Sequence, residues 1–253
     1  MLPIQKLGSA ADLRLRDVYG VSDFKVSRRF RSNNNCEVYA MDSFGQFIYA
    51  SEIVSQCKFA LGGLGQLNFA LKSIQESSDA QPERSQFFCN EVFRSIHSFL
   101  SHASNISRLF WPAVPERLNE ESEEAYEARI SSQPSVARAR ALRAAFGLPD
   151  DHVLKSRKLH DLLEHFDEKL DQWRATNAHQ NIINDYIGPK DDIIGAAETY
   201  MMRWFDPSKG TFTFRGETFD LQALSTAADE MLQRATKVEE QLREKLKNEA
   251  LAL

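Results

Sequence analysis

Apolar side chains recur every three or four residues along most of the chain, which is the spacing of amphipathic helices. This pattern predicts helices over residues 37–61, 66–75, 86–111, 120–130, 136–146, 156–173 and 221–248. Between the first two, Gly62 and Gly63 are expected to stop the helix, because glycine is the preferred residue just after a helix end. Pro112 and Pro115 are expected to end the third.

A strand-like pattern is found only near the C-terminus. In TFTFRGETF, Phe212 and Phe214 alternate with polar residues, and Arg215-Gly216-Glu217 suits a tight turn, which predicts an antiparallel hairpin. The expected fold is mainly α, a multi-helix bundle with a small antiparallel β-hairpin near the C-terminus. Residues 1–178 would form the helical bundle domain, and residues 179–253 the hairpin plus a C-terminal helix packed on that bundle, as one continuous domain.

The last predicted helix carries a narrow apolar seam flanked by charged residues. Its members are Leu224, Ala228, Met231, Ala235, Val238, Leu242 and Leu246. Such a seam suits packing on another helix. That helix can belong to the same bundle or to a second subunit, and the seam alone favours neither.

Composition narrows the class of protein. The three cysteines are widely spaced and odd in number, so we expect buried thiols in a reducing compartment. No signal peptide is recognised, and no apolar run reaches the about 18 residues of a membrane helix. A soluble, cytoplasmic protein is expected, with no membrane partner.

The net charge is −5, but basic residues are concentrated in the segments 14–31 and 138–158. These segments form either an ordinary surface of mixed charge or a groove that binds nucleic acid.

The strongest chemical signal lies in SRKLHDLLEHFDEKLDQW, residues 156–173. On a helix its apolar residues form one stripe facing the core: Leu159, Leu163, Phe166, Leu170 and Trp173. His160 and Glu164 then lie on one flank of the stripe, because residues four apart stack one turn above each other. Arg157, Asp161 and His165 lie on another flank.

Three interpretations of these flanks stay open. The simplest is a set of exposed one-turn pairs with no further role. The second is a divalent-metal site, since Asp161 with His165, and His160 with Glu164, have the one-turn spacing of a clamp. The third is metal-independent RNA cleavage, in which histidine serves as general base or acid and a cation supports the phosphorane-like state.

The run HDLLEH resembles the motif helix of the HEPN superfamily, a group of helical-bundle ribonucleases, RNA-binding modules and defence components. Asp161 stands at the polar second position of that motif and His165 at its histidine. His160 occupies the place of the family arginine, and Arg157 lies one turn earlier. The resemblance implies a dimeric endoribonuclease or RNA-binding protein with catalytic residues His165, His160, Asp161 and Arg157.

The middle helix adds a further set of polar residues: His97, His102, Asn105 and Arg108. With Glu164 they are expected to border a polar cleft beside HDLLEH. The sequence thus predicts an RNA- or nucleotide-binding protein, with no cofactor, acting as a homodimer. A non-enzymatic protein-interaction module and a metal-binding helical bundle are the alternatives.

Overall fold

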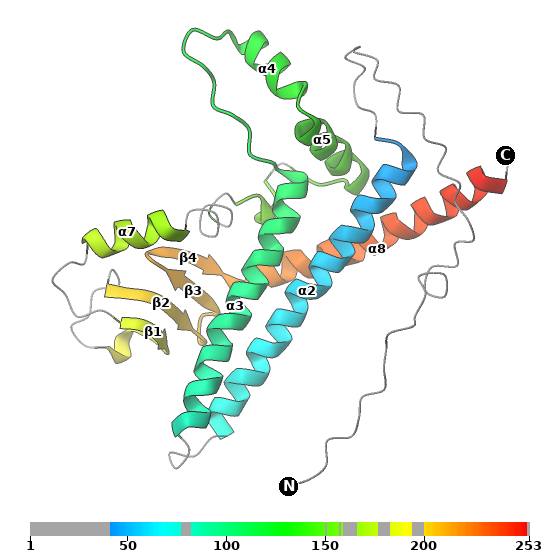
Figure 1. The fold of residues 1–253 in the computed structure, drawn as a ribbon. Coiled ribbons are helices and arrows are strands. Elements are labelled where there is room, and N and C mark those ends of the chain that lie inside the picture. Colours follow the sequence, from blue (N-terminus) through cyan, green and yellow to red (C-terminus); the bar gives the residue numbers. More distant parts are fainter. Residues whose placement is uncertain are drawn as a thin grey trace. The chain divides into compact units, whose positions relative to one another are not determined.

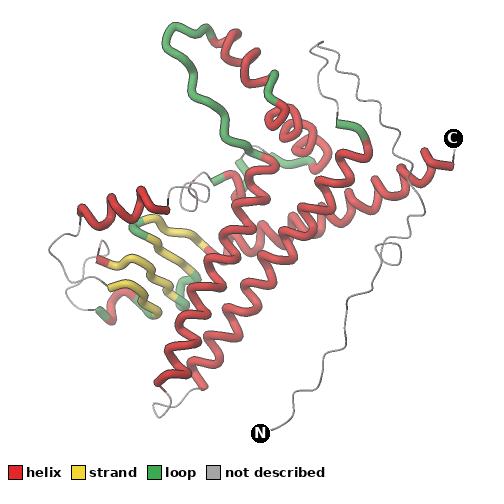
Figure 2. The backbone as a smooth tube through the Cα atoms, in the orientation of Figure 1, coloured by secondary structure: helices red, strands yellow, loops and turns green. Residues whose placement is uncertain are grey.

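The computed structural model describes residues 41–76, 82–149, 151–156, 158, 166–176, 183–193 and 200–251. All of them belong to one compact unit that spans residues 37–253. This unit is mainly helical, with one small sheet near the C-terminus (Figures 1 and 2). In the described ranges, no helix is both long enough and apolar enough to span a bilayer.

Three long helices form the core: α2 (Ser43–Glu76), α3 (Pro82–Phe110) and α8 (Leu221–Leu251). Helix α2 packs along α3 and also against α8 (Figure 1). The predicted seam of α8 is buried at Leu224, Ala228, Met231, Ala235 and Leu242. Because these residues join the same core cluster as α2 and α3, the seam packs inside the chain.

Helix α2 runs without a break where a stop was predicted, so the prediction of two helices separated by Gly62 and Gly63 is wrong. Gly63 is buried against α3. A Cβ atom on it would lie 3.2 Å from the carbonyl oxygen of Ser95 and 3.3 Å from the amide nitrogen of Phe99. This glycine therefore permits close packing of two helix backbones, whereas Gly62 and Gly65 face open space.

Local capping explains several helix ends. The Oδ1 atom of Asp42 accepts a hydrogen bond from the Gly45 amide at 2.7 Å, which caps α2. Ser122 caps α4 (Glu123–Ser131) in the same way. Helix α5 (Pro134–Phe146) ends at Gly147, which has a left-handed backbone with φ 59°.

The helices predicted at 86–111, 120–130 and 136–146 are confirmed. A short 3-10 turn, η1 (Val153–Lys155), follows, and of the helix predicted at 156–173 the structure describes α7 (Phe166–Thr176).

The sheet is larger than the predicted hairpin. Its strands are β1 (Ile183–Ile187), β2 (Met201–Asp206), β3 (Thr211–Phe214) and β4 (Glu217–Asp220), in the order β1-β2-β3-β4. Strands β3 and β4 form the expected hairpin, and positive φ at Arg215 and Gly216 suits a type I′ turn. Strand β2 extends it antiparallel, whereas β1 pairs with β2 in parallel. The β element is thus a four-stranded mixed sheet.

Aromatic rings join this sheet to α3. The ring of Phe212 lies 6.4 Å from that of Phe93, and the imidazole of His97 meets Phe212 and Phe214 edge-on at 5.7 and 5.5 Å. Phe212 and Phe214 are fully or almost fully buried. This cluster joins α3 to the sheet, and two of its members, Phe93 and His97, also line the site described next.

Candidate functional site

A polar hollow of about 390 Å³ lies between α3 and the first two strands. Helix α3 contributes Asn90, Phe93, Arg94 and His97, β1 contributes Asp185 and β2 contributes Arg203. The helical residues are three, four and seven positions apart, so one face of α3 presents all of them. The volume falls in the range of small-molecule sites, roughly 300–1,000 Å³.

Strand register brings Arg203 to this hollow with a fixed partner. Asp185 pairs with Arg203 across β1 and β2, and Arg203 pairs with Phe214 across β2 and β3. The Asp185 carboxylate contacts the guanidinium at two points, Nε at 2.5 Å and Nη2 at 3.2 Å. The guanidinium also lies over the Phe93 ring, 5.8 Å from its centre. Arg203 is therefore held in place before any ligand arrives, with Nη1 outside the pair.

His97 is a partly buried titratable group of the hollow. Its Nε2 atom is buried and has no hydrogen-bond partner among the described residues. Burial lowers the pKa of His97, and the nearby cations Arg203 and Arg215 lower it further, while Asp185 acts in the opposite direction. The imidazole is thus neutral at neutral pH.

Arg94 is an exposed residue of α3 that also lines the hollow. Its guanidinium donates to both carboxylate oxygens of Glu91 at 2.6–2.9 Å, and to the Gln66 side chain of α2 at 2.9 Å. These hydrogen bonds lower the pKa of Glu91. Beside it, the Asn90 amide accepts a hydrogen bond from Gln86 at 3.2 Å. The hollow therefore offers two arginines, one amide and one imidazole, the side chains that commonly bind oxyanions.

The residues predicted as catalytic, Arg157, His160, Asp161 and His165, lie outside the described part of the chain, as does Glu164. A metal site built from the same residues lies outside it too. Within the described ranges, no group of three or more histidine, cysteine, aspartate or glutamate side chains is arranged to hold a metal ion.

The four polar residues predicted on the middle helix face different neighbours. His97 faces the sheet. His102 Nδ1 lies 2.8 Å from Gln56 Oε1 on α2, and Asn105 donates to the same oxygen at 3.1 Å. The carbonyl oxygen of Arg108 accepts from the Arg138 side chain of α5 at 3.4 Å. Of these four residues, His102 and Asn105 are the two that share a described neighbour, the side chain of Gln56.

Sequence reasoning missed Arg203, Asp185, Asn90 and Arg94. A signal was present for Arg203, because MMRWF, residues 201–205, places a single charge within an otherwise apolar segment. The role of Arg203 depends on its pairing with Asp185 of the parallel strand β1, and no local sequence pattern identifies that strand as the partner.

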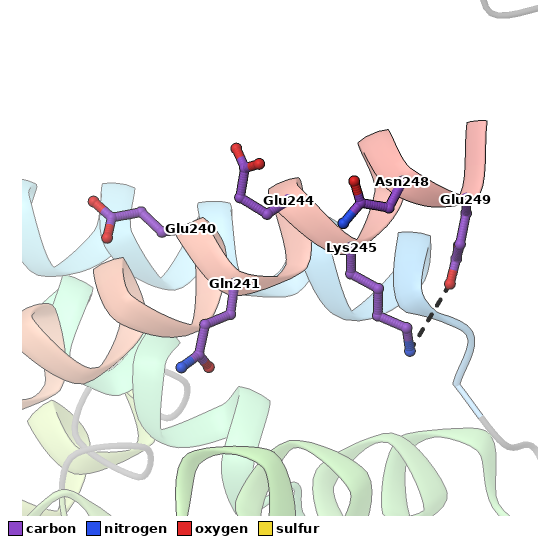
Figure 3. A pocket seen from close by; sticks show the side chains of 6 residues that line it. All are labelled: Glu240, Gln241, Glu244, Lys245, Asn248 and Glu249. Carbon is purple, nitrogen blue, oxygen red and sulfur yellow. Dashed lines mark ion pairs between the residues drawn. The ribbon is translucent and has the colours of Figure 1, made fainter. Parts of the chain in front are cut away.

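A broader depression runs along the C-terminal half of α8 (Figure 3). Its described lining is Glu240, Gln241, Glu244, Lys245, Asn248 and Glu249. These side chains all project from one helix, and Lys245 pairs with Glu249 at 3.9 Å. Since no described side chain from another element converges on it, this depression is a less suitable ligand site than the hollow beside His97.

Comparison with known proteins identifies no relative. No family model matches the chain, and no curated protein or solved structure is significantly similar to it.

Proposed function

We propose that the protein binds RNA or a nucleotide through a phosphate group held in the hollow between α3 and the sheet. The observation that supports this most directly is the guanidinium of Arg203, which Asp185 positions in a hollow that Arg94, Asn90 and His97 also line. Arginine is well suited to the same anion because its planar donors match phosphate geometry.

Substitution of Arg203 tests the binding proposal. We expect Arg203→Gln to weaken the binding of a short fluorescently labelled single-stranded RNA by about tenfold or more, because it removes a positioned charge-assisted donor. Arg117→Gln is the matched control, since Arg117 is an ion-paired arginine in the loop between α3 and α4, away from the hollow. Fluorescence anisotropy measures both, and thermal melting checks that both variants fold. Equal affinities for the two variants would exclude the hollow as the RNA site.

Metal-independent RNA cleavage is the catalytic part of this proposal and rests on the resemblance of HDLLEH to the HEPN motif. His165 would act as the general base or acid of the cleavage step. Asp161 would be the polar partner of the motif, and Arg157 or His160 would supply positive charge. We expect the wild-type protein to cut labelled single-stranded RNA in the presence of EDTA and His165→Ala to lose this activity by about a hundredfold or more. Gel electrophoresis of the products measures it. Equal cutting by both proteins, or none by either, contradicts the assignment.

A second candidate function, a protein-interaction module that forms a homodimer, is favoured by exposed aromatic side chains on α2 and α3. Phe69 is 66% exposed and Phe87 is 57% exposed. Both lie against Phe88, with ring centres 6.0 and 5.3 Å away. Clustered exposed aromatic rings are typical of interaction surfaces. The predicted seam of α8 no longer serves this role, because it packs inside the chain.

Light scattering tests the dimer. We expect the wild-type protein to have about twice the chain mass of 28.8 kDa, and Phe69→Ser combined with Phe87→Ser to return it to the mass of one chain. The variant removes apolar area from the surface and no buried contact of the core. A single-chain mass for the wild-type protein at high concentration would rule out this surface as a self-association site.

A further inference from the structure

A short joint connects α5 to η1 and holds both to the rest of the fold. Leu154 of η1 is fully buried and belongs to the core cluster, and η1 packs against α3 and α8. At the other end of the joint, the Arg234 side chain of α8 donates to the carbonyl oxygens of Phe146 and Gly147 at 3.4 and 3.2 Å. The joint is therefore fixed at two points, the C-terminus of α5 and the turn of η1.

His152 makes the hydrogen bond at the second of these points. Its Nδ1 atom accepts from the Leu154 amide at 3.2 Å and so caps the N-terminus of η1. Because a backbone amide can only donate, this Nδ1 atom carries no proton, and the neutral ring has its proton on Nε2. The same ring stacks on the indole of Trp111, the residue after α3, with ring centres 5.5 Å apart and planes tilted by 22°. The neutral imidazole thus ties η1 to the end of α3.

The surroundings of His152 oppose its protonation. Its pKa is lowered from 6.5, first by burial and then by Arg234, while Glu230 of α8 and Asp151 of the joint act in the opposite direction. The folded protein therefore binds this proton less tightly than the unfolded chain does. The stability that the neutral ring contributes is complete above about pH 6.5, and it is lost as the pH falls through the lower pKa of the folded protein.

We infer that His152 is a pH-sensitive latch: a proton on its Nδ1 atom breaks the cap of η1 and loosens the joint between α5 and η1. An imidazolium has two N–H donors and no acceptor, so the Leu154 amide loses its partner. The same positive charge repels Arg234, which caps the end of α5, so protonation acts on the first fixed point as well. Histidine protonation between about pH 5 and pH 6 switches packed contacts in this way.

The position of the joint in the chain gives the latch its importance. Helix η1 ends at Lys155, and the segment 156–173, which resembles the HEPN motif helix, follows directly. The joint is thus the N-terminal attachment of this segment to the described core. The latch itself does not depend on RNA binding or cleavage, because its parts are a described imidazole and a described backbone amide.

Nuclear magnetic resonance of the full chain provides the test, with two readouts on the wild-type protein. The ring nitrogens of His152 report its protonation, and hydrogen exchange of the Leu154 amide, corrected for the intrinsic rate, reports the cap. We expect the protection of this amide to fall about fivefold or more between about pH 7.5 and about pH 5, because it loses a capping hydrogen bond of ordinary strength. The midpoint of this fall should coincide with the titration of the ring.

Two variants separate the cap from the charge. His152→Asn keeps a capping acceptor that cannot be protonated, so the Leu154 amide should stay protected at both pH values. His152→Ala removes the acceptor, so protection should be low at both. His97 and His102, whose pKa values burial also lowers, are unchanged in each variant. Any effect of these two histidines on global stability therefore appears in all three proteins.

Three outcomes would overturn the latch. An equal fall of protection in the wild-type protein and in His152→Asn would mean that another group senses the pH. A His152 ring that takes up no proton down to about pH 5 would remove the sensor. A ring that titrates while the Leu154 amide stays protected would mean that the proton does not break the cap. The last two outcomes need the wild-type protein alone, so a folding defect in a variant does not hide the result.

Discussion

Gly63→Leu should destabilise the protein by about 3 kcal/mol, because a side chain at this position has no room between two helix backbones. Even a Cβ atom would lie 3.2 Å from the Ser95 carbonyl oxygen and 3.3 Å from the Phe99 amide nitrogen, and both are backbone atoms that no rotamer change can move. The leucine can be accommodated only if α2 and α3 separate. That separation would open the core around Phe99, which is fully buried.

The neighbouring glycines provide matched controls for this prediction. Nothing lies within 4 Å of a Cβ atom built on Gly62 or Gly65, and both lie in the same helix. We expect Gly62→Ala and Gly65→Ala each to stabilise the protein by about 0.4–1 kcal/mol, because alanine loses less backbone entropy in a helix. Gly62→Leu should be close to neutral. Urea denaturation followed by circular dichroism measures all four variants, and equal stability of Gly62→Leu and Gly63→Leu would contradict the close helix contact.

Phe212→Ala should cost about 3–5 kcal/mol, the range for truncating a large aromatic side chain in a core. Phe212 is fully buried and lies against Phe93 and His97 of α3 and Phe214 of its own strand. Its removal leaves a cavity at the contact that joins the sheet to the helices. Because Phe212 contacts Phe93 and His97, which both line the hollow, the variant should weaken phosphate binding together with stability.

Phe59→Ala is the control for that experiment. Phe59 is 57% exposed, so its truncation should change stability by no more than about 0.5 kcal/mol. Phe212→Leu is an informative intermediate, since leucine restores much of the volume and should recover more than half of the lost stability. Equal urea midpoints for Phe212→Ala and Phe59→Ala would mean that the sheet is not held to α3 by this ring.

The helical part of the fold followed from local pattern. The apolar spacing of residues 86–111 and the prolines after it predicted α3, and the seam from Leu224 onward predicted α8. The turn at Arg215 and Gly216 could also be predicted from the sequence, because a two-residue turn with positive φ favours glycine. In each case the information lies within a few residues, because helices and tight hairpins form their backbone hydrogen bonds at that range.

Gly63 shows where local reasoning fails. A pair of glycines after an apolar helix resembles a helix end, and glycine in a helix interior costs about 1 kcal/mol. The cost is offset by the contact of α2 with α3, a segment about 30 residues away in the sequence. Only the packed structure distinguishes a stopping glycine from one that admits a neighbouring backbone.

By itself, the sequence determined a mainly helical chain and the hairpin of β3 and β4, while RNA chemistry at the histidines and carboxylates of residues 156–173 stays a prediction. Tertiary structure decided the partner of the α8 seam, the parallel pairing of β1 with β2, and the meeting of His97 with Arg203 and Asp185. The physical reason is distance along the chain. Periodicity shows which face of an element is apolar, whereas the hollow depends on which distant element covers that face and in which register.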